Sequence, residues 1–171
     1  AITAGAFAVP VYEIYKVGQQ PRWWQGLDLL GAAIGVSAAV IPHFNNAEGA
    51  THDTRYCYLG ESRLRQLEFG LPAESIVFGI DEHTGVVIDL DTETLRVFGR
   101  GCLTLRKLDV VETLASGVEL PLTEIRQLAA GIAATKTDTS NAAGLQPLAR
   151  PNEAAAAVAE AIADLPLAGV D

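Results

Sequence analysis

The sequence predicts a three-layer α/β fold in which helices cover both faces of a largely parallel sheet. Two apolar runs carry this prediction, AAIGVSAAVI at 32–41 and SIVFGI at 75–80. Neither contains a charge, as is typical of strands buried on both faces of a parallel sheet, although periodicity alone also allows a buried helix at 32–41. Between them, leucines recur at spacings of three and four over 60–70, which indicates an amphipathic helix that Gly70 and Pro72 close.

The other elements follow from local patterns. We expect a buried helix over residues 1–9 that stops at Pro10, a hairpin of 85–90 with 94–99, and an added edge strand over 102–108. These complete a predicted domain of residues 1–120. The remainder, 121–171, is predicted as a helical tail with helices at 122–134 and 152–164, either peripheral or forming an interface pair.

Composition excludes several classes of function. The chain has 171 residues, of which 49% are hydrophobic and 19% charged, so a packed globular domain is expected. The net charge of −9 argues against nucleic acid or an anionic membrane as the main partner. No apolar run has the 18 or so residues of a membrane span, and two cysteines are too few for a disulfide scaffold, so we expect free thiols and a cytoplasmic protein. The absence of methionine and the apolar opening lead us to expect a fragment truncated at its N-terminus.

His43 is the leading candidate for chemistry. It follows the predicted strand 32–41 and is flanked by Pro42 and Phe44, and sites in open α/β sheets lie at the carboxyl ends of strands. Rigid neighbours there suit a positioned general base, although a histidine that merely ends the strand is the structural alternative. His52 lies in a polar loop and His83 in a predicted turn, and both are expected to be structural or solvated.

Rival sites are weaker. The histidines, together with nearby Asp, Glu and Cys, supply zinc ligand types, but none of the usual ligand spacings is present, so no metal and no cofactor are predicted. Ser37 lies inside a buried run rather than at a strand-to-helix turn, and its GVSAA context lacks the last glycine of a nucleophile elbow. The glycines of GRG at 99–101 lie in a hairpin turn with no following helix, which excludes a dinucleotide loop.

Two longer segments resemble a known family. PHFNNAEGATHDTRYCYLGESRLRQL (42–67) and SIVFGIDEHTGVVIDLDTETLRVFGRG (75–101) are similar to the serine peptidase family that includes α-aspartyl dipeptidase and cyanophycinase. With VPVYEIYKVG (9–18), the likeness extends over residues 1 to about 108 and is closest to bacterial type 1 glutamine amidotransferase-like proteins. It implies a flavodoxin-like, class I glutamine amidotransferase-like sheet.

The resemblance also implies roles for residues. It makes His43 the general base and Glu13 the acidic third member, with the elbow serine upstream of Ala1 or, as a departure from the family, replaced by Thr3 of TAGA. The implied activity is serine-type hydrolysis of a small peptide or amide, with this fragment alone inactive. A non-catalytic domain that binds a metabolite or a partner is the alternative, and a homo-oligomer stays open.

The loop 43–55 is expected to line the same cleft as His43. Its candidate substrate contacts are Asn45, Asn46 and Arg55. Asp53 and Glu48 are the next candidates for the orienting acid if Glu13 lies too far from the imidazole.

Overall fold

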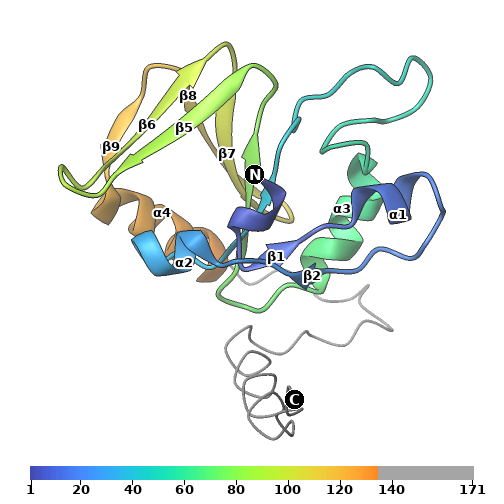
Figure 1. Cartoon of the computed structure of the whole chain (residues 1–171), viewed down its shortest axis with the longest axis horizontal. Helices are drawn as coiled ribbons and strands as arrows, with labels where there is room; N and C mark the ends of the chain where they lie inside the picture. The colour runs from blue at the N-terminus through green and yellow to red at the C-terminus, as the bar shows by residue number, and fades with distance from the viewer. Residues whose placement is uncertain (135–171) are drawn as a thin grey trace, which may run out of the picture.

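The structure is a computed structural model that describes residues 1–134. It is a mixed α/β arrangement of two sheets and four α-helices (Figure 1). The larger sheet has six strands in the order β2-β1-β3-β4-β7-β8, and the smaller has three in the order β5-β6-β9. The strands are β1 (Phe7–Ala8), β2 (Trp24–Gln25), β3 (Ala38–Ile41), β4 (Ile76–Ile80), β5 (Thr84–Asp89), β6 (Thr94–Gly99), β7 (Cys102–Lys107), β8 (Val110–Ala115) and β9 (Glu119–Pro121). The helices are a 3-10 turn, η1 (Ile2–Ala4), followed by α1 (Val11–Tyr15), α2 (Leu29–Ile34), α3 (Gly60–Phe69) and α4 (Leu122–Ala134).

The parallel centre of the sheet agrees with the sequence prediction. β3 and β4 pair in parallel with Ala38 opposite Ile76, and every residue of β3 is buried. The predicted single strand over 32–41 is nevertheless too long. Residues up to Ile34 belong to α2, which ends where Gly35 adopts a left-handed φ of 70°, and only the last four residues of the run form the strand.

The predicted helix over residues 1–9 is wrong. This segment forms η1 and then β1, which pairs in parallel with β3 and antiparallel with β2. Its small residues serve close approach to a strand rather than helix packing. A Cβ at Gly5 would lie 2.3 Å from the carbonyl oxygen of Ala38, and the Ala6 N–H donates to that oxygen at 2.8 Å.

The hairpin of β5 and β6 is confirmed, with Val86 opposite Val97. The expected edge strand over 102–108 is instead an inner strand. β7 lies antiparallel between β4 and β8, and all but its first residue are buried. β8 was not predicted because its burial pattern leaves it mostly exposed, so its sequence carries little apolar alternation.

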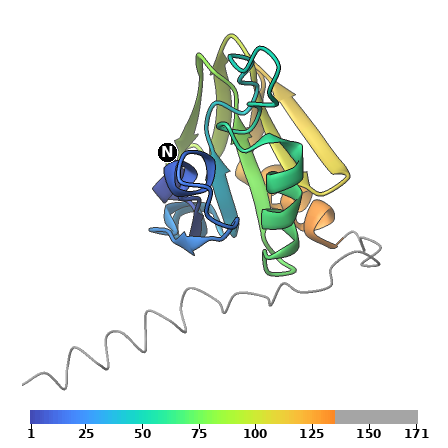
Figure 2. The same cartoon turned by 90° about the vertical axis from the view of Figure 1, so that its right-hand side faces the viewer.

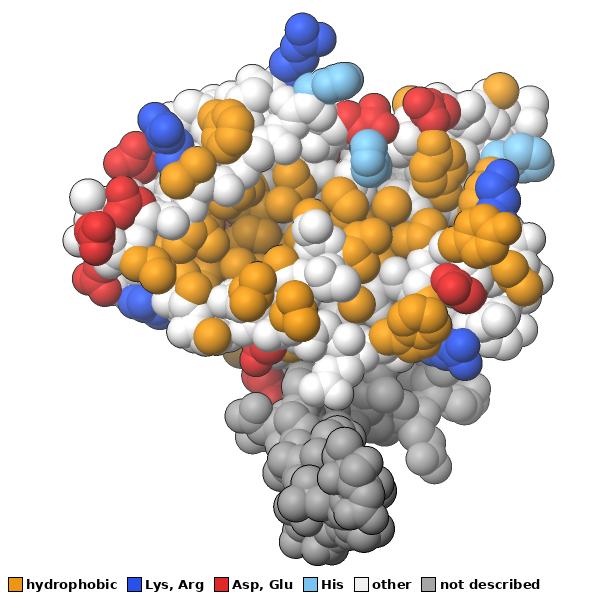
Figure 3. Space-filling view, viewed as in Figure 1, with side chains coloured by type: hydrophobic (Ala, Val, Ile, Leu, Met, Phe, Trp, Pro, Cys, Tyr) orange, Lys and Arg blue, Asp and Glu red, His pale blue; other side chains and the backbone are white. Residues whose placement is uncertain are grey.

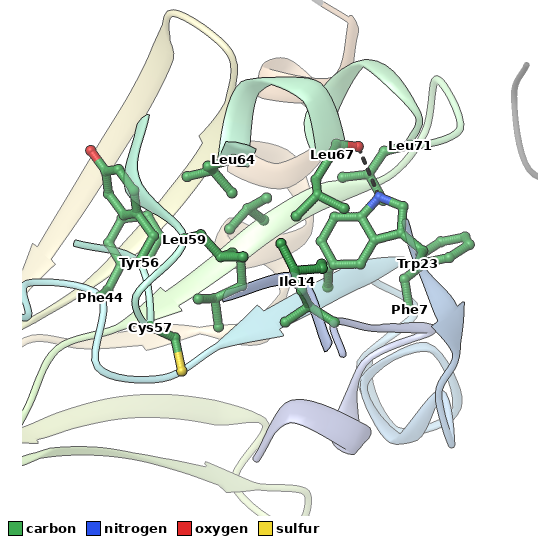
Figure 4. Packing of buried hydrophobic residues seen from close by; sticks show 14 of the residues in the cluster. Phe7, Ile14, Trp23, Phe44, Tyr56, Cys57, Leu59, Leu64, Leu67 and Leu71 are labelled. Atoms are coloured by element: carbon green, nitrogen blue, oxygen red, sulfur yellow. Dashed lines mark hydrogen bonds between the residues drawn. The ribbon is translucent and has the colours of Figure 1, made fainter. Parts of the chain in front are cut away.

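Two hydrophobic cores fill the opposite faces of the large sheet. Alternate residues of β3 point to each: Ala39 to the core beneath α1 and α3, and Val40 to the core beneath α2, α4 and β6. Figure 2 shows α3 running beside β4, and Figure 4 shows the first core, in which Trp23 Nε1 donates to the Leu67 carbonyl at 2.8 Å.

Helix α4 belongs to the second core. Leu122, Ile125 and Ile132 are each 3% exposed or less, so a peripheral tail beginning at residue 121 is wrong for the described part of that segment. The predicted helix at 152–164 lies outside the described residues. None of the described helices combines the length and apolar character that a bilayer span requires.

Candidate functional site

The site begins at a tight turn after β3. The Asn46 N–H donates to the His43 carbonyl at 3.1 Å, which closes the turn, and His43 itself adopts a left-handed φ of 49°. The turn is tied to the next strand, because the Phe44 N–H donates to the carbonyl of Ile80 at 3.0 Å. The carboxyl ends of parallel strands meet at one edge of a sheet, so the residues that follow β3 and β4 lie together there.

Gly79 of β4 allows this turn to pack closely against the sheet. A Cβ at Gly79 would lie 2.4 to 2.6 Å from ring atoms of Phe44, so only glycine leaves room for that ring against β4. On its other side the Phe44 ring meets the ring of Tyr56, with centroids 4.5 Å apart. The backbone next to His43 is therefore fixed by a buried aromatic contact.

The imidazole of His43 contacts the carboxylate of Glu82, which follows β4. Nδ1 of His43 and Oε1 of Glu82 are 3.0 Å apart. The His43 side chain is 57% exposed and that of Glu82 29%, so the pair sits at the surface with the ring open to solvent. Hydrogen bonds from His43 first, and then from Asn46, hold the pKa of Glu82 below its usual value.

This pairing gives the imidazole a defined chemical role. A carboxylate on Nδ1 favours the tautomer with the proton on that nitrogen, which leaves Nε2 as the free base. The same carboxylate stabilises the imidazolium once Nε2 has taken a proton. The geometry suits proton transfer by His43 and orientation by Glu82.

Glu82, and not Glu13, is thus the carboxylate paired with His43. Glu13 lies on α1, and within residues 1–134 its carboxylate makes no hydrogen bond to the imidazole. A signal for Glu82 was present in the sequence, since Asp81 and Glu82 come directly after the buried run of β4. Glu82 is the second residue after β4, as His43 is the second after β3.

The two asparagines face Glu82 rather than open space. The Asn45 Oδ1 accepts from the Glu82 backbone N–H at 2.8 Å, and the Asn46 Nδ2 donates to Glu82 Oε1 at 3.0 Å. Asn46 is 1% exposed, so this arrangement leaves almost none of it open to the substrate that it was predicted to contact. Asn45 is exposed, and its predicted role as a substrate contact stays a prediction.

The remaining loop candidates are engaged elsewhere. Arg55 forms a bidentate pair with Asp53, at 2.9 and 2.8 Å, and both side chains remain partly exposed. The carboxylate of Asp53 is therefore paired with Arg55 and not with His43. This pairing, together with the N–H groups of Glu61 and Arg55, lowers the pKa of Asp53. Glu48 accepts the hydroxyl hydrogen of Tyr58.

Ser37 and Cys57 have surroundings that do not suit a nucleophile. Ser37 Oγ lies 2.8 Å from Ser75 Oγ, at the start of the two parallel strands and at the opposite end from His43. Cys57 is buried, and burial raises the pKa of its thiol, which disfavours the reactive thiolate.

A cavity of about 370 Å³ lies beside the pair. His43, Glu82 and His83 supply polar groups to its wall, and Ala1 and Val86 supply apolar ones. Apolar side chains gather across the face of the molecule drawn in Figure 3, with histidines and carboxylates at their margin. A larger cavity of about 490 Å³, at the start of α3, includes neither member of the pair. Within residues 1–134 no group of three or more His, Cys, Asp or Glu side chains converges as a metal site.

The chain is therefore an α/β protein that presents a histidine–carboxylate pair at the carboxyl edge of its parallel strands. No family model and no curated protein matches it. Among solved structures, it is similar to the crystal structure of a peptidase from an acI-B1 Actinobacterium, with 21% sequence identity and a TM-score of 0.48. The match covers 71% of this chain and 42% of that peptidase, so the chain spans about two fifths of its neighbour's length.

Proposed function

We propose that the protein is a serine-type amide or peptide hydrolase in which His43 is the general base and Glu82 the orienting acid. The observation that carries the proposal is the 3.0 Å contact between His43 Nδ1 and Glu82 Oε1, on an exposed ring at the carboxyl edge of two parallel strands. The proposal includes the class I glutamine amidotransferase-like sheet that the resemblance implies, and a cytoplasmic location. Free cysteines Cys57 and Cys102 are consistent with that compartment.

The chemistry follows from the pair. His43 Nε2 takes the proton of a hydroxyl nucleophile as its oxygen attacks the amide carbonyl. The imidazolium, stabilised by Glu82, returns that proton to the departing amine when the carbon–nitrogen bond breaks. A water, deprotonated by the same nitrogen, then attacks the acyl carbonyl, and the imidazolium returns the proton to the nucleophile's oxygen as the acid departs.

The nucleophile is an elbow serine of a longer chain, as the resemblance implies, or Thr3 within this sequence. Thr3 is exposed on η1, and Ala1, two residues before it, lines the same cavity as His43. The cavity's size suits a small peptide or amide substrate.

A binding domain without catalysis is the second candidate. One observation favours it: among the described residues, no hydroxyl or thiol is hydrogen-bonded to His43. The same pair would then bind a polar ligand instead of activating a nucleophile.

Labelling of the protein, expressed from its entire coding sequence, with a fluorophosphonate probe tests the proposal. Wild type is expected to be labelled at a serine or at Thr3, and peptide mapping identifies which. His43→Asn is expected to reduce labelling and turnover by several orders of magnitude, since asparagine tolerates the left-handed backbone at this position but is not a base.

Ser37→Ala is the matched control, because Ser37 is a hydroxyl residue whose Oγ lies beside Ser75 away from the pair. It is expected to label as wild type does. An unlabelled wild-type protein, with any turnover unchanged in His43→Asn, would reject the hydrolase and favour the binding domain.

A further inference from the structure

We propose that Asn46 is a positioning residue that fixes the side chains of His43 and Glu82 in their positions relative to each other. The inference rests on the proposed function for its catalytic meaning, but its structural content is independent of turnover. One residue connects to both partners: its backbone N–H donates to the His43 carbonyl at 3.1 Å, and its side-chain amide donates to Glu82 Oε1 at 3.0 Å.

The orientation of the Asn46 amide follows from its second contact. Its Oδ1 lies 3.2 Å from the backbone N–H of Glu48, a donor that requires an oxygen acceptor. The other end of the amide is therefore the NH₂ group, and it faces the carboxylate of Glu82. Reversing the amide would set two donors against each other at one end and two acceptors at the other.

The oxygen that Asn46 contacts is the one that receives His43. Oε1 of Glu82 accepts from both Nδ1 of His43 and Nδ2 of Asn46, each at 3.0 Å. Two donors on one oxygen fix its direction, and the buried Asn46 side chain has little freedom to leave. The Asn45 Oδ1 adds a third constraint by accepting from the Glu82 backbone N–H.

The charged groups around Glu82 determine how much the Asn46 amide affects the pKa of its carboxyl group. His43 and His83 are the basic groups that face it, and both influence its carboxyl group. Tyr58, which donates to Glu48, lies near Glu82 as well and also contacts the Asn46 side chain. The Asn46 amide is a neutral donor to Glu82, and its loss disfavours the ionised form of that carboxylate.

The two asparagines supply a matched pair of variants. Asn45→Asp keeps an acceptor for the Glu82 N–H, whereas Asn46→Asp replaces the donor by a carboxylate aimed at Glu82. Both add one negative charge to the same loop, so the difference between them isolates the donor. Asn46→Ser adds no charge, keeps an acceptor for the Glu48 N–H, and is too short to reach Glu82 at the same time.

The test is an NMR titration of the Glu82 side-chain carboxyl carbon in this chain. We expect a higher pKa for Glu82 in Asn46→Ser, a still higher one in Asn46→Asp, and a smaller increase in Asn45→Asp. Equal increases in the two Asp variants, or a Glu82 titration in Asn46→Ser that matches wild type, would overturn the proposal. If Asn46→Asp does not fold, the comparison of Asn46→Ser with wild type decides.

Turnover of the longer protein separates this inference from the hydrolase proposal. Asn46→Ser is expected to lower kcat by on the order of tenfold or more with KM nearly unchanged, as for outer partners that orient a reactive group. A shifted Glu82 titration without any turnover in wild type would support the positioning role and reject the hydrolase. An unchanged titration with an active wild type would do the reverse.

Discussion

Arg106 is the most heavily engaged charged side chain among the described residues. Its guanidinium, on a side chain only 7% exposed, donates to Glu68 at 3.0 Å and to Glu61 at 2.6 Å. It also lies over the ring of Tyr56, 5.1 Å from the centroid. Glu68 additionally accepts the Leu108 backbone N–H at 2.9 Å, so α3, β7 and the loop before α3 are joined through one buried cluster.

Removing one partner of this cluster is expected to be costly. Glu68→Ala leaves a buried guanidinium and a backbone N–H short of an acceptor, so the free energy of unfolding should fall by about 3–5 kcal/mol. Arg65→Ala is the control, because its pair with Asp109 is exposed and should contribute less than about 1 kcal/mol. Urea unfolding followed by circular dichroism measures both. Equal losses in the two variants would show that burial does not decide the strength of these pairs.

The environment of Glu61 makes the free energy of unfolding depend on pH. The pKa of Glu61 is lowered, chiefly by hydrogen bonds from Arg106. A depressed folded-state pKa contributes stability above the unfolded value of about 4.3, and the contribution is lost as pH falls through the folded pKa.

We therefore expect the urea midpoint to decline below about pH 4.5, and to decline less steeply in Glu61→Gln than in wild type. A series of unfolding curves between about pH 3 and 7 tests this. A decline of identical steepness in the two proteins would assign the acid sensitivity to other carboxylates, such as Asp53.

At the site, the sequence predicted one partner of the pair and not the other. His43 was found because an apolar run ends just before it. Glu82 was not predicted, because the family resemblance implies Glu13 as the acid. Glu82 nevertheless follows the carboxyl end of β4, just as His43 follows the carboxyl end of β3. The role of Asn46 was beyond the sequence, since only the folded turn shows that its amide faces a carboxylate from 36 residues away.

The hairpin of β5 and β6 depends on a turn with a defined backbone conformation. Residues 90–93 connect the strands, Asp89 Oδ1 accepts from the N–H groups of Asp91 and Thr92, and Glu93 has a positive φ of 51°. The Glu93 carbonyl also accepts the N–H of Leu122 at 2.8 Å, which ties the turn to the start of α4.

Replacing Glu93 by glycine and by valine should therefore have different effects on thermal stability. A left-handed backbone costs an ordinary residue roughly 1–2 kcal/mol and a β-branched one more, whereas glycine adopts it freely. We expect Glu93→Gly to be at least as stable as wild type and Glu93→Val to be less stable by about 1–2 kcal/mol in thermal unfolding. At Thr92, whose φ is not positive, the order of glycine and valine should reverse. The same order at both positions would contradict the argument.

Elements were predictable from the sequence where one pattern extended over their whole length. The leucine spacing of α3 falls in this group, as do the two apolar runs of β5 and β6 on either side of their turn residues. The run at 32–41 failed because the exposed residues of α2 that it contains, Ala32 and Ala33, are themselves apolar, so no charged residue marks the boundary at Gly35. β7 was misplaced to an edge because sequence alternation does not reveal which partners a strand will have.

The two hydrophobic cores share the central strands of the large sheet, so the free energy of unfolding should depend on both. Ile125 of α4 is fully buried in the second core, and Gln127 lies two residues away on the exposed face. Ile125→Ala should cost about 2–5 kcal/mol and Gln127→Ala no more than about 0.5 kcal/mol. Differential scanning calorimetry, with a single transition in wild type, measures the difference. A loss below about 1 kcal/mol for Ile125→Ala would mean that α4 is dispensable to the core.

The exposed surface retains apolar character at one sheet edge. Trp24 of β2 is 48% exposed, and Leu27 and Leu29, which follow it, are 68% and 54% exposed. β2 has only two residues, which leaves few free backbone groups for pairing with another chain.

The contact of Phe44 with Gly79 has a genetic consequence. A single added methyl group at Gly79 would push the Phe44 ring away from the sheet and displace the turn that carries His43, without altering any polar atom of the site. A screen for inactive mutants should therefore recover Gly79 as readily as the reactive residues. Phe44→Leu, which removes ring atoms from the point of collision, is the second-site change from which a revertant of Gly79→Ala should be selected.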